Sequence, residues 1–304
     1  MQDFVAHKPK KKSAAAKSLS KLTVLLMVLA GVILVIIFLL KSIHFGDFVR
    51  SQEKQTILLV YNAADKSTAY LLEADFSSLA LAVYPLDSEV EIELGDYGNY
   101  RFQSVYPLLA SVEKKPLNFV RSTYSFSLGR VIDEVWPVNQ PLKFFTQKTE
   151  LKSIFFSRNI WQLPGSLIMK GSWLALVSDP RTEFNFYNLR TSFPLETRSD
   201  TTDSSLFLCS IAVINTTSVN GLAGQIENVL SADGFSVIRT ATDDQTLEKT
   251  ELVVSTDKTS QQHCQRVQTK ISKLLPGEAT LKLDDGITNR YRADLVVKLG
   301  EDMK

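Results

Sequence analysis

The sequence predicts an α/β protein anchored in a membrane by one N-terminal helix, and three features of the chain support this fold class. An uncharged apolar run occupies residues 22–40. Behind it, stretches with the residue spacing of strands alternate with stretches that have the spacing of helices. A polar segment at residues 196–205 divides this region into a larger and a smaller part. We therefore expect one transmembrane helix followed by two α/β domains of unequal size.

The apolar run, LTVLLMVLAGVILVIIFLL, carries no charge over nineteen residues. A helix of that length spans roughly 28 Å, close to the thickness of the hydrocarbon core of a bilayer. A cleaved signal peptide has a shorter apolar core and a small-residue cleavage site, which residues 41–45 (KSIHF) do not provide. A buried helix of a soluble domain would show a polar face, and the run has none. We interpret residues 22–40 as a transmembrane helix whose partner is the lipid bilayer.

The basic residues around this helix predict its orientation. Six lysines lie within residues 1–21, whereas Lys41 and Arg50 follow soon after the helix. Lysine and arginine are retained on the cytoplasmic side of a membrane. We therefore expect residues 1–21 to form a basic cytoplasmic tail and the chain from residue 41 onward to be extracytoplasmic, in a single-pass protein of the cell membrane. A retention signal explains the tail more simply than nucleic-acid binding does, so we expect no nucleic-acid partner.

Residues 41–54 are polar and lack a periodic pattern, and we interpret them as a short stalk. The larger domain, residues 55–195, begins with the apolar stretches ILLVY, AYLLEA and LALAVYPL and the alternating stretch VEIEL, which predict strands. From residue 104 to 135, apolar residues recur every three or four positions, which is typical of helices with one buried face. Residues 142–179 predict more helix. Helices should therefore pack against a sheet in this domain.

The smaller domain, residues 206–304, follows a linker at residues 196–205. The strand-like stretches LFLCSIAVIN, FSVIRT, ELVVST and ADLVVKL alternate with predicted helices at residues 219–232 and 261–275. Gly234 follows the first helix, at a position where a left-handed residue is favoured. This order of elements predicts a second α/β domain.

Polar residues precede the first helix of the smaller domain. Asn215 and the three hydroxyl residues after it offer side chains that can cap the helix start. A helix N-terminus can also hold an anion or a sugar, so Asn215, Asn220 and Gly221 are candidate ligand-binding residues. A plain capped turn is the simpler interpretation. Residues 284–286 (DDG) likewise predict a turn.

Few residues of the exported part suggest catalysis. Cys209 and Cys264 could pair in an oxidising compartment, but one lies in a predicted strand and the other in a predicted helix, and two separate buried thiols fit the sequence at least as well. Neither has metal-ligand spacing around it, and we expect no metal. His7, His44 and His263 provide no catalytic triad, which disfavours a hydrolase. The sequence contains no phosphate-cradling glycine motif, which disfavours nucleotide use.

The smaller domain is similar to a known family in three segments. The strand AVIN is followed by NGLAGQIENVLSADGFSV at residues 220–237, and ADLVVKLGED closes the domain at residues 293–302. In this order the segments resemble the LytR C-terminal domain family, which is found at the ends of bacterial envelope proteins. The resemblance implies a role in a bacterial cell envelope.

Residues 55–195 resemble a degenerate copy of the LytR-CpsA-Psr domain, which usually follows a membrane helix and precedes that C-terminal module. The matching segments are ILLVY, the strand that ends in Asp75, LAVYPLDSEVEI, GNYRFQSVY and SFSLGRVIDEVW. The resemblance implies transfer of lipid-linked glycopolymers onto the cell wall. That chemistry needs a pyrophosphate and a divalent cation held by carboxylates and arginines.

The sequence departs from this family at the residues that the chemistry needs. The family's Arg-x-Asp falls on residues 65–67, which read DKS, and its Pro-Arg-Asp falls on residues 85–87, which read PLD. A leucine cannot contact a phosphate, and lysine does not replace the two-pronged guanidinium. The later arginine-rich segment of the family is not recognisable, although Arg158, Arg181 and Arg190 lie in that region. The arginines of the family's site are thus mostly absent.

We therefore expect a non-catalytic, membrane-anchored protein of a bacterial envelope that needs no cofactor and binds or scaffolds cell-wall glycan or envelope proteins. The alternative is an active glycopolymer phosphotransferase with a rearranged site around Asp65, Lys66, Asp87 and Arg101, which would require Mg²⁺. Asp87 taken alone is more simply a carboxylate that closes a turn.

Overall fold

The computed structural model describes residues 54–61, 69–93, 98–112, 116–138, 148–155, 167–188, 190 and 208–303. The predicted cytoplasmic tail, transmembrane helix and linker lie outside the described residues, as does all of the predicted stalk except Lys54. Among the helices that are described, none has both the length and the apolar character needed to cross a membrane. The chain divides into two compact units, Met1–Gln52 and Glu53–Lys304, and every described element belongs to the second.

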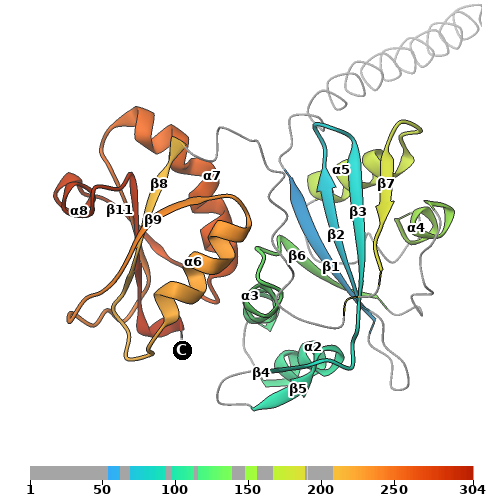
Figure 1. Cartoon of the computed structure of the whole chain (residues 1–304), viewed down its shortest axis with the longest axis horizontal. Coiled ribbons are helices and arrows are strands. Elements are labelled where there is room, and N and C mark those ends of the chain that lie inside the picture. Colours follow the sequence, from blue (N-terminus) through green and yellow to red (C-terminus); the bar gives the residue numbers. More distant parts are fainter. Residues whose placement is uncertain are drawn as a thin grey trace, which may run out of the picture. The chain divides into compact units, whose positions relative to one another are not determined.

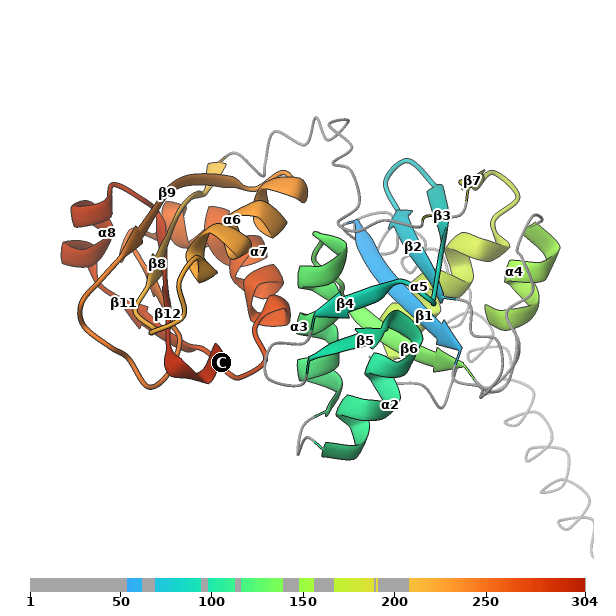
Figure 2. The same cartoon turned by 60° about the horizontal axis from the view of Figure 1, so that its bottom comes forward.

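The second unit is a mixed α/β structure, and its first sheet has the strand order β6-β1-β2-β3-β7 (Figure 1). The strands of this sheet are β1 (Gln55–Tyr61), β2 (Ala69–Asp75), β3 (Ala80–Leu86), β6 (Glu134–Val138) and β7 (Glu183–Phe186). A separate two-stranded ribbon pairs β4 (Glu91–Glu93) with β5 (Asn99–Arg101). Figure 2 shows this ribbon next to α2 (Phe102–Val112).

The first sheet is antiparallel in its centre and parallel at both edges. Strand β2 pairs antiparallel with β1 and β3, whereas β6 and β7 run parallel to their neighbours. One face packs against α2 and α3 (Pro116–Leu128), and the other carries α5 (Leu167–Ser178), with α4 (Lys148–Phe155) beside it (Figure 1). Both faces are therefore buried, which explains why β1 carries four consecutive buried apolar residues, Ile57 to Val60, instead of alternating apolar and polar ones.

Four aromatic residues fill the layer between the first sheet and helices α4 and α5. Trp173 stacks on Phe155 with ring centroids 5.7 Å apart, and it meets Phe76 and Trp136 edge-on at 6.0 and 6.4 Å. None of the four is more than 1% exposed. These rings are therefore core residues, since edge-on and stacked pairs of this kind add to the free energy gained from burial.

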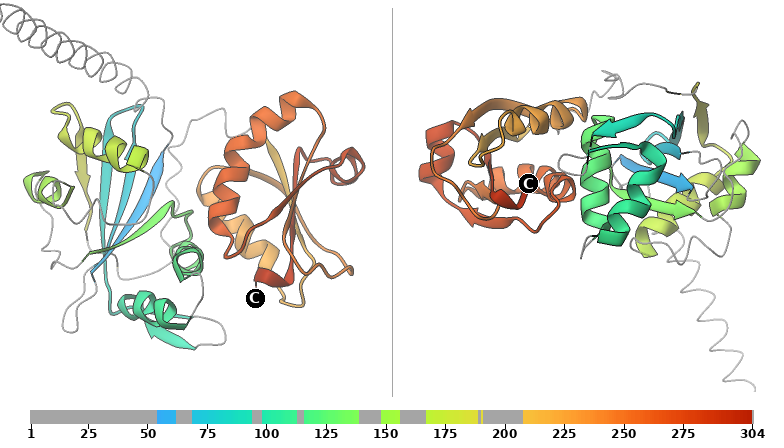
Figure 3. Two further views of the ribbon diagram at one scale, coloured as in Figure 1. Left: turned by 180° about the vertical axis from the view of Figure 1, so that it is seen from behind. Right: turned by 90° about the horizontal axis from the view of Figure 1, so that it is seen from below.

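The second sheet has the strand order β11-β10-β12-β8-β9. Its elements in chain order are β8 (Ser210–Asn215), α6 (Leu222–Ala232), β9 (Ser236–Thr242), β10 (Glu251–Val254), α7 (Lys258–Leu274), β11 (Thr280–Leu283), α8 (Asp285–Tyr291) and β12 (Leu295–Leu299), followed by a short 3₁₀ helix (Glu301–Met303). Helices α6 and α7 cover one face and α8 lies on the other (Figure 3). The predicted buried face of α6, which comprises Leu222, Ile226, Val229 and Leu230, is confirmed.

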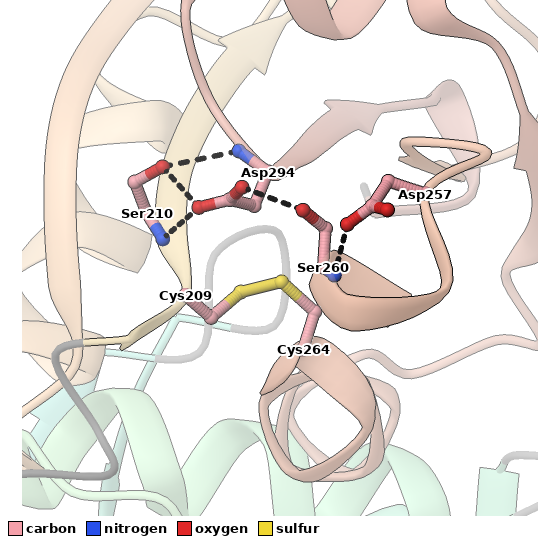
Figure 4. The surroundings of a disulfide bond; sticks show 6 residues. All are labelled: Cys209, Ser210, Asp257, Ser260, Cys264 and Asp294. Carbon is pink, nitrogen blue, oxygen red and sulfur yellow. Dashed lines mark hydrogen bonds between the residues drawn. A yellow bond between two sulfur atoms is a disulfide. The ribbon is translucent and has the colours of Figure 1, made fainter. Parts of the chain in front are cut away.

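The two cysteines form a disulfide, which resolves the alternatives that the sequence left open. Cys209 immediately precedes β8 and Cys264 lies in α7, with a Cα–Cα distance of 5.1 Å. A polar network flanks the bond (Figure 4). In this network Asp294 accepts hydrogen bonds from the amide and hydroxyl of Ser210 and from the hydroxyl of Ser260. The disulfide and the network together fasten the start of β8 to α7.

Several sequence predictions need correction. The helical spacing predicted up to residue 135 ends at residue 128, because Gly129 adopts a left-handed φ of 65° and β6 starts five residues later. Strands β6, β7 and β11 were not predicted. Residues 284–286 are not a simple turn, because Asp284 caps α8 by accepting a hydrogen bond from the Ile287 amide at 3.1 Å. The predicted left-handed residue after α6 is confirmed, since Gly234 has a φ of 84°.

Candidate functional site

Asp87 directly follows β3, where the family resemblance expects a metal-binding carboxylate. Its Oδ1 accepts a hydrogen bond from the Glu89 amide at 3.0 Å, and its own amide donates to the carbonyl of Arg190 at 2.8 Å. The carboxylate therefore closes a turn, as the simpler interpretation of the sequence predicts. The hydrogen bond to the carbonyl of Arg190 also ties this turn to the segment after β7.

Arg101, the second described candidate, lies at the end of β5 and pairs with the same Glu89. The Arg101 Nη1 atom is 2.8 Å from Glu89 Oε2, and Gln103 Nε2 donates to Glu89 Oε1 at 2.8 Å. Arg101 and Glu89 are 60% and 55% exposed, so the ion pair contributes little to stability. The structure thus brings Asp87 and Arg101 to a common neighbour, whereas Asp65 and Lys66 lie outside the described residues.

The residues around this turn do not fit a magnesium site. Magnesium in phosphoryl-transfer sites is held by carboxylates together with substrate phosphates. Glu89 is already engaged by Arg101 and Gln103, which leaves Asp87 as a single carboxylate at the turn. Within the described ranges, no group of three or more His, Cys, Asp or Glu side chains could hold a metal ion.

Backbone pairing places Arg190 beside the end of β3. It forms an isolated parallel bridge with Leu86, and its amide donates to the carbonyl of Pro85 at 2.9 Å. Its Nε atom is buried and has no hydrogen-bond partner in the part of the chain that the structure describes. The sequence analysis named Arg190 among the arginines in the region of the family's arginine-rich segment. It could not place Arg190 beside Leu86, the residue at the position of the family's arginine, because this pairing joins segments about a hundred residues apart.

Asn215 ends β8 and organises the turn that follows, so the predicted side-chain cap of α6 is wrong. Its Oδ1 accepts hydrogen bonds from the amide and hydroxyl of Thr217 at 3.0 and 2.8 Å, and its Nδ2 donates to the carbonyl of Val219 at 2.7 Å. Helix α6 instead begins after Gly221, which has a φ of 80° and offers no capping side chain. Asn220 and Gly221 are exposed, but the amide of Asn215 is buried and engaged.

A buried carboxylate that the sequence analysis did not identify joins β1, β6 and α7. Asp133 is fully buried, and each of its oxygens lies 2.8 Å from Lys270 Nζ, while Lys273 Nζ is 2.7 Å from Oδ1. The Thr56 amide donates to its Oδ2 at 2.7 Å. Lys270 Nζ also donates to the carbonyl of Lys54 at 3.3 Å. This network fastens the first residues of β1 to helix α7.

The pKa values of two carboxyl groups in this region, those of Asp133 and Asp233, are shifted in opposite directions. Burial would raise the pKa of Asp133, but the ammonium groups of Lys270 and Lys273 outweigh burial and hold its pKa below the ordinary value. Asp233, which follows α6, accepts a hydrogen bond from the Val131 amide at 3.2 Å. Burial raises the pKa of Asp233 to about 7, although Lys270 opposes the shift. Asp133 is therefore charged at neutral pH, whereas Asp233 changes its charge there.

Comparison with known proteins gives one family match and no curated relative. The family described as LytR cell envelope-related transcriptional attenuator matches residues 209–302. The search of curated proteins finds no match. Among solved structures, a transcriptional regulator from Enterococcus faecalis shares 7% identity with this chain and covers 46% of this chain and 77% of its own, with a TM-score of 0.32.

A second solved structure is the LytR-CPS2A-psr family protein YwtF (TagT) with bound octaprenyl pyrophosphate lipid. It shares 12% identity with this chain, and the alignment covers 74% of this chain and 92% of that structure's chain, with a TM-score of 0.25. TM-scores this low do not establish a shared fold. The family match, in contrast, spans β8 to β12 with α6, α7 and α8, and it includes both cysteines of the disulfide. Residues 209–302 therefore match the model of the family described as LytR cell envelope-related transcriptional attenuator.

Proposed function

We propose that this protein is a non-catalytic component of a bacterial cell envelope, anchored in the membrane by residues 22–40, that binds or scaffolds cell-wall polymer or envelope proteins through the unit Glu53–Lys304. The observation that carries the proposal is the LytR C-terminal domain at residues 209–302, because the family is described as related to the cell envelope. The degenerate resemblance of residues 55–195 to the LytR-CpsA-Psr domain agrees with it.

The disulfide supports an extracytoplasmic location for the folded unit. Disulfides form and persist in oxidising compartments and are rare in the cytosol. Cys209 and Cys264 are both fully buried, so the bond belongs to the core of its domain. This agrees with the orientation that the lysines of residues 1–21 predict for the membrane helix.

The environment of β3 supports a role without catalysis. Leu86 stands where the family has an arginine, and it is 1% exposed in the core. Asp87 serves the turn, and Glu89 is neutralised by Arg101. Phosphoryl transfer depends on charge neutralisation by several convergent cations, which this arrangement does not supply.

Co-sedimentation of the full-length protein in detergent with isolated bacterial cell walls tests the proposal. We expect the protein to sediment with walls, and we expect walls stripped of their covalently attached polymers to retain less of it. A protein that stays in the supernatant with both wall preparations, and that captures no envelope protein after cross-linking in membranes, would contradict the binding and scaffolding role.

Titration with a lipid pyrophosphate analogue, with and without Mg²⁺, tests the phosphotransferase alternative. The proposal predicts no magnesium-dependent binding to the full-length protein. Binding that requires Mg²⁺ and is abolished by both Asp87→Ala and Arg190→Ala would replace the proposal with the phosphotransferase function. Arg181→Ala is the matched control, because Arg181 is exposed and pairs with Asp179 two residues away.

A further inference from the structure

Helix α5 lacks the polar outer side that a helix on the surface of a domain normally has. Its one charged residue, Lys170, is 4% exposed and lies on the buried side together with Trp173. The residues that are not buried carry no charge, and they are Leu167, Ile168, Gly171, Leu174, Ala175 and Ser178. Leu167 and Ile168 are 70% and 56% exposed. The helix thus turns its charge inward and apolar side chains outward.

The six uncharged residues form one strip along α5, because they recur at steps of three, four and seven positions. The hydroxyl of Ser178 does not make this outer strip more polar, since it donates to the Leu174 carbonyl of the same helix at 2.6 Å. The next charged residue along the chain is Asp179, which lies beyond the helix end. The outer strip is therefore uncharged over the full length of α5.

Helix α5 lies at the end of the first sheet where β1 begins (Figure 1). Trp173 Nε1 donates to Oε1 of Gln55, the first residue of β1, at 2.9 Å. The same indole meets Phe76, which directly follows β2. Only residues 41–54 separate Gln55 from the predicted membrane helix, and a chain of that length reaches at most about 50 Å. The end of the sheet that carries α5 is thus the end at which the chain arrives from the membrane.

The area of the outer strip favours a membrane surface over a second copy of the chain. A helix of 12 residues is roughly 18 Å long and about 10 Å wide, so one side of it offers on the order of 200 Å². A specific protein–protein interface buries about 800 Å² on each partner. A bilayer contact needs no such area, because the predicted membrane helix already holds the exported unit beside the bilayer, at a high effective concentration.

We propose that α5 is a second membrane contact, in which Leu167 and Ile168 enter the extracytoplasmic surface of the bilayer that residues 22–40 span. Apolar side chains are stabilised at the boundary between headgroups and acyl chains without the helix crossing the membrane. The contact depends on apolar burial and not on charge, so it persists at high salt. It fixes the orientation of the exported unit on the membrane. This inference goes beyond the proposed function but rests on its membrane anchor.

Quenching of a fluorescent label by lipids tests the contact in the full-length protein. The protein is reconstituted at one copy per nanodisc in equal amounts of phosphatidylcholine and phosphatidylglycerol, with an environment-sensitive dye on Ile168→Cys. Cys209 and Cys264 do not take the dye, because they are buried and joined in the disulfide. Lipids with a nitroxide near the top of the acyl chain should lower the emission at least about twofold, since interfacial side chains lie roughly 5–10 Å deep. High salt should not restore the emission.

The matched control carries the dye on Leu281→Cys. Leu281 is a leucine of β11 with a similar exposed fraction, 58%, and it lies in the second sheet. A dye at this position should not be quenched. In the Ile168→Cys background, Leu167→Asp should restore most of the emission, because a carboxylate resists transfer into the bilayer. The melting temperature should stay the same, since the Leu167 side chain is largely exposed.

The outcomes separate this inference from the proposed function. No quenching of the dye on Ile168→Cys in discs that contain the protein, or equal quenching of the dye on Leu281→Cys, would overturn the membrane contact and leave the proposed function standing. Disulfide cross-linking between two copies of the Ile168→Cys protein in detergent would also overturn it, by assigning the outer strip to a second copy. Protein that does not enter the discs would refute the anchor at residues 22–40, and the inference would fall with it.

Discussion

Removal of the disulfide should destabilise the C-terminal domain by about 4 kcal/mol. Cys209 and Cys264 are 55 residues apart in the sequence. In the chain-entropy description, closing a loop of that length lowers the entropy of the unfolded chain by roughly 14 cal/mol/K, which corresponds to about 4 kcal/mol at 25 °C. The folded state should change little in the double variant Cys209→Ala/Cys264→Ala, because the hydrogen bonds of Asp294 hold the same two segments together. The loss should therefore act mainly through the unfolded state.

Urea unfolding followed by far-ultraviolet circular dichroism measures this effect. The midpoint for the double alanine variant should fall, and the slope of free energy against urea should rise, because the unfolded chain without the bond is more expanded. Dithiothreitol should lower the midpoint of the wild type toward that of the variant and leave the variant unaffected. A loss below about 1 kcal/mol, with an unchanged slope, would refute the argument that the bond acts by restricting the unfolded chain.

Three further predictions concern buried groups. Asp133→Ala should lower the free energy of unfolding by about 3–5 kcal/mol, because it leaves the ammonium groups of Lys270 and Lys273 without their counter-charge. Thermal unfolding measures this loss, and a loss as small as that from removing an exposed ion pair would contradict the network. Asp233 has a folded pKa of about 7, above its unfolded value, so its contribution to stability should be complete below about pH 4 and should be lost as pH rises to 7. Asp233→Asn should flatten this part of the stability profile, and an unchanged slope between pH 4 and 7 would show that another group is responsible. Gly300→Ala should destabilise the C-terminal domain by about 3 kcal/mol, because the new Cβ would lie 2.3 Å from the carbonyl carbon of Lys249; an unaltered melting temperature would refute this steric argument.

The sequence predicted elements whose apolar residues recur with a clear spacing over several turns or positions. It missed short strands, whose few residues show no distinct spacing. Helix α6 was found because its buried residues recur with helical spacing, and its end was marked by Gly234. Strand β6 was missed because Val131 and Ile132 continue the helical spacing of α3 beyond the helix end at residue 128. Strand β6 contains Pro137, which an edge strand tolerates because one of its edges forms no hydrogen bonds with a neighbouring strand.

The candidate site shows the same division between local and distant information. The turn at Asp87 was predicted, because an aspartate that accepts a hydrogen bond from the amide two residues later is a local motif. The uncharged outer strip of α5 was not predicted, since a helix with apolar residues all round does not reveal which side packs on the sheet. The sequence also could not show whether Cys209 and Cys264 form a disulfide, because the distance between them depends on how α7 packs on β8.

The contacts of Asp133 imply that the C-terminal domain completes the fold of the segment before it. Val131, which lies between α3 and β6, is fully buried in the apolar cluster formed by α6, α7 and the second sheet. The Ser122 hydroxyl and the Arg121 Nε atom donate to carbonyls at the end of α7, at 2.7 and 2.8 Å. Because α7 also supplies both cations for Asp133, a chain without residues 209–302 would leave a buried carboxylate unpaired next to exposed apolar surface. Residues 209–302 are thus part of the structural support of β1 and β6.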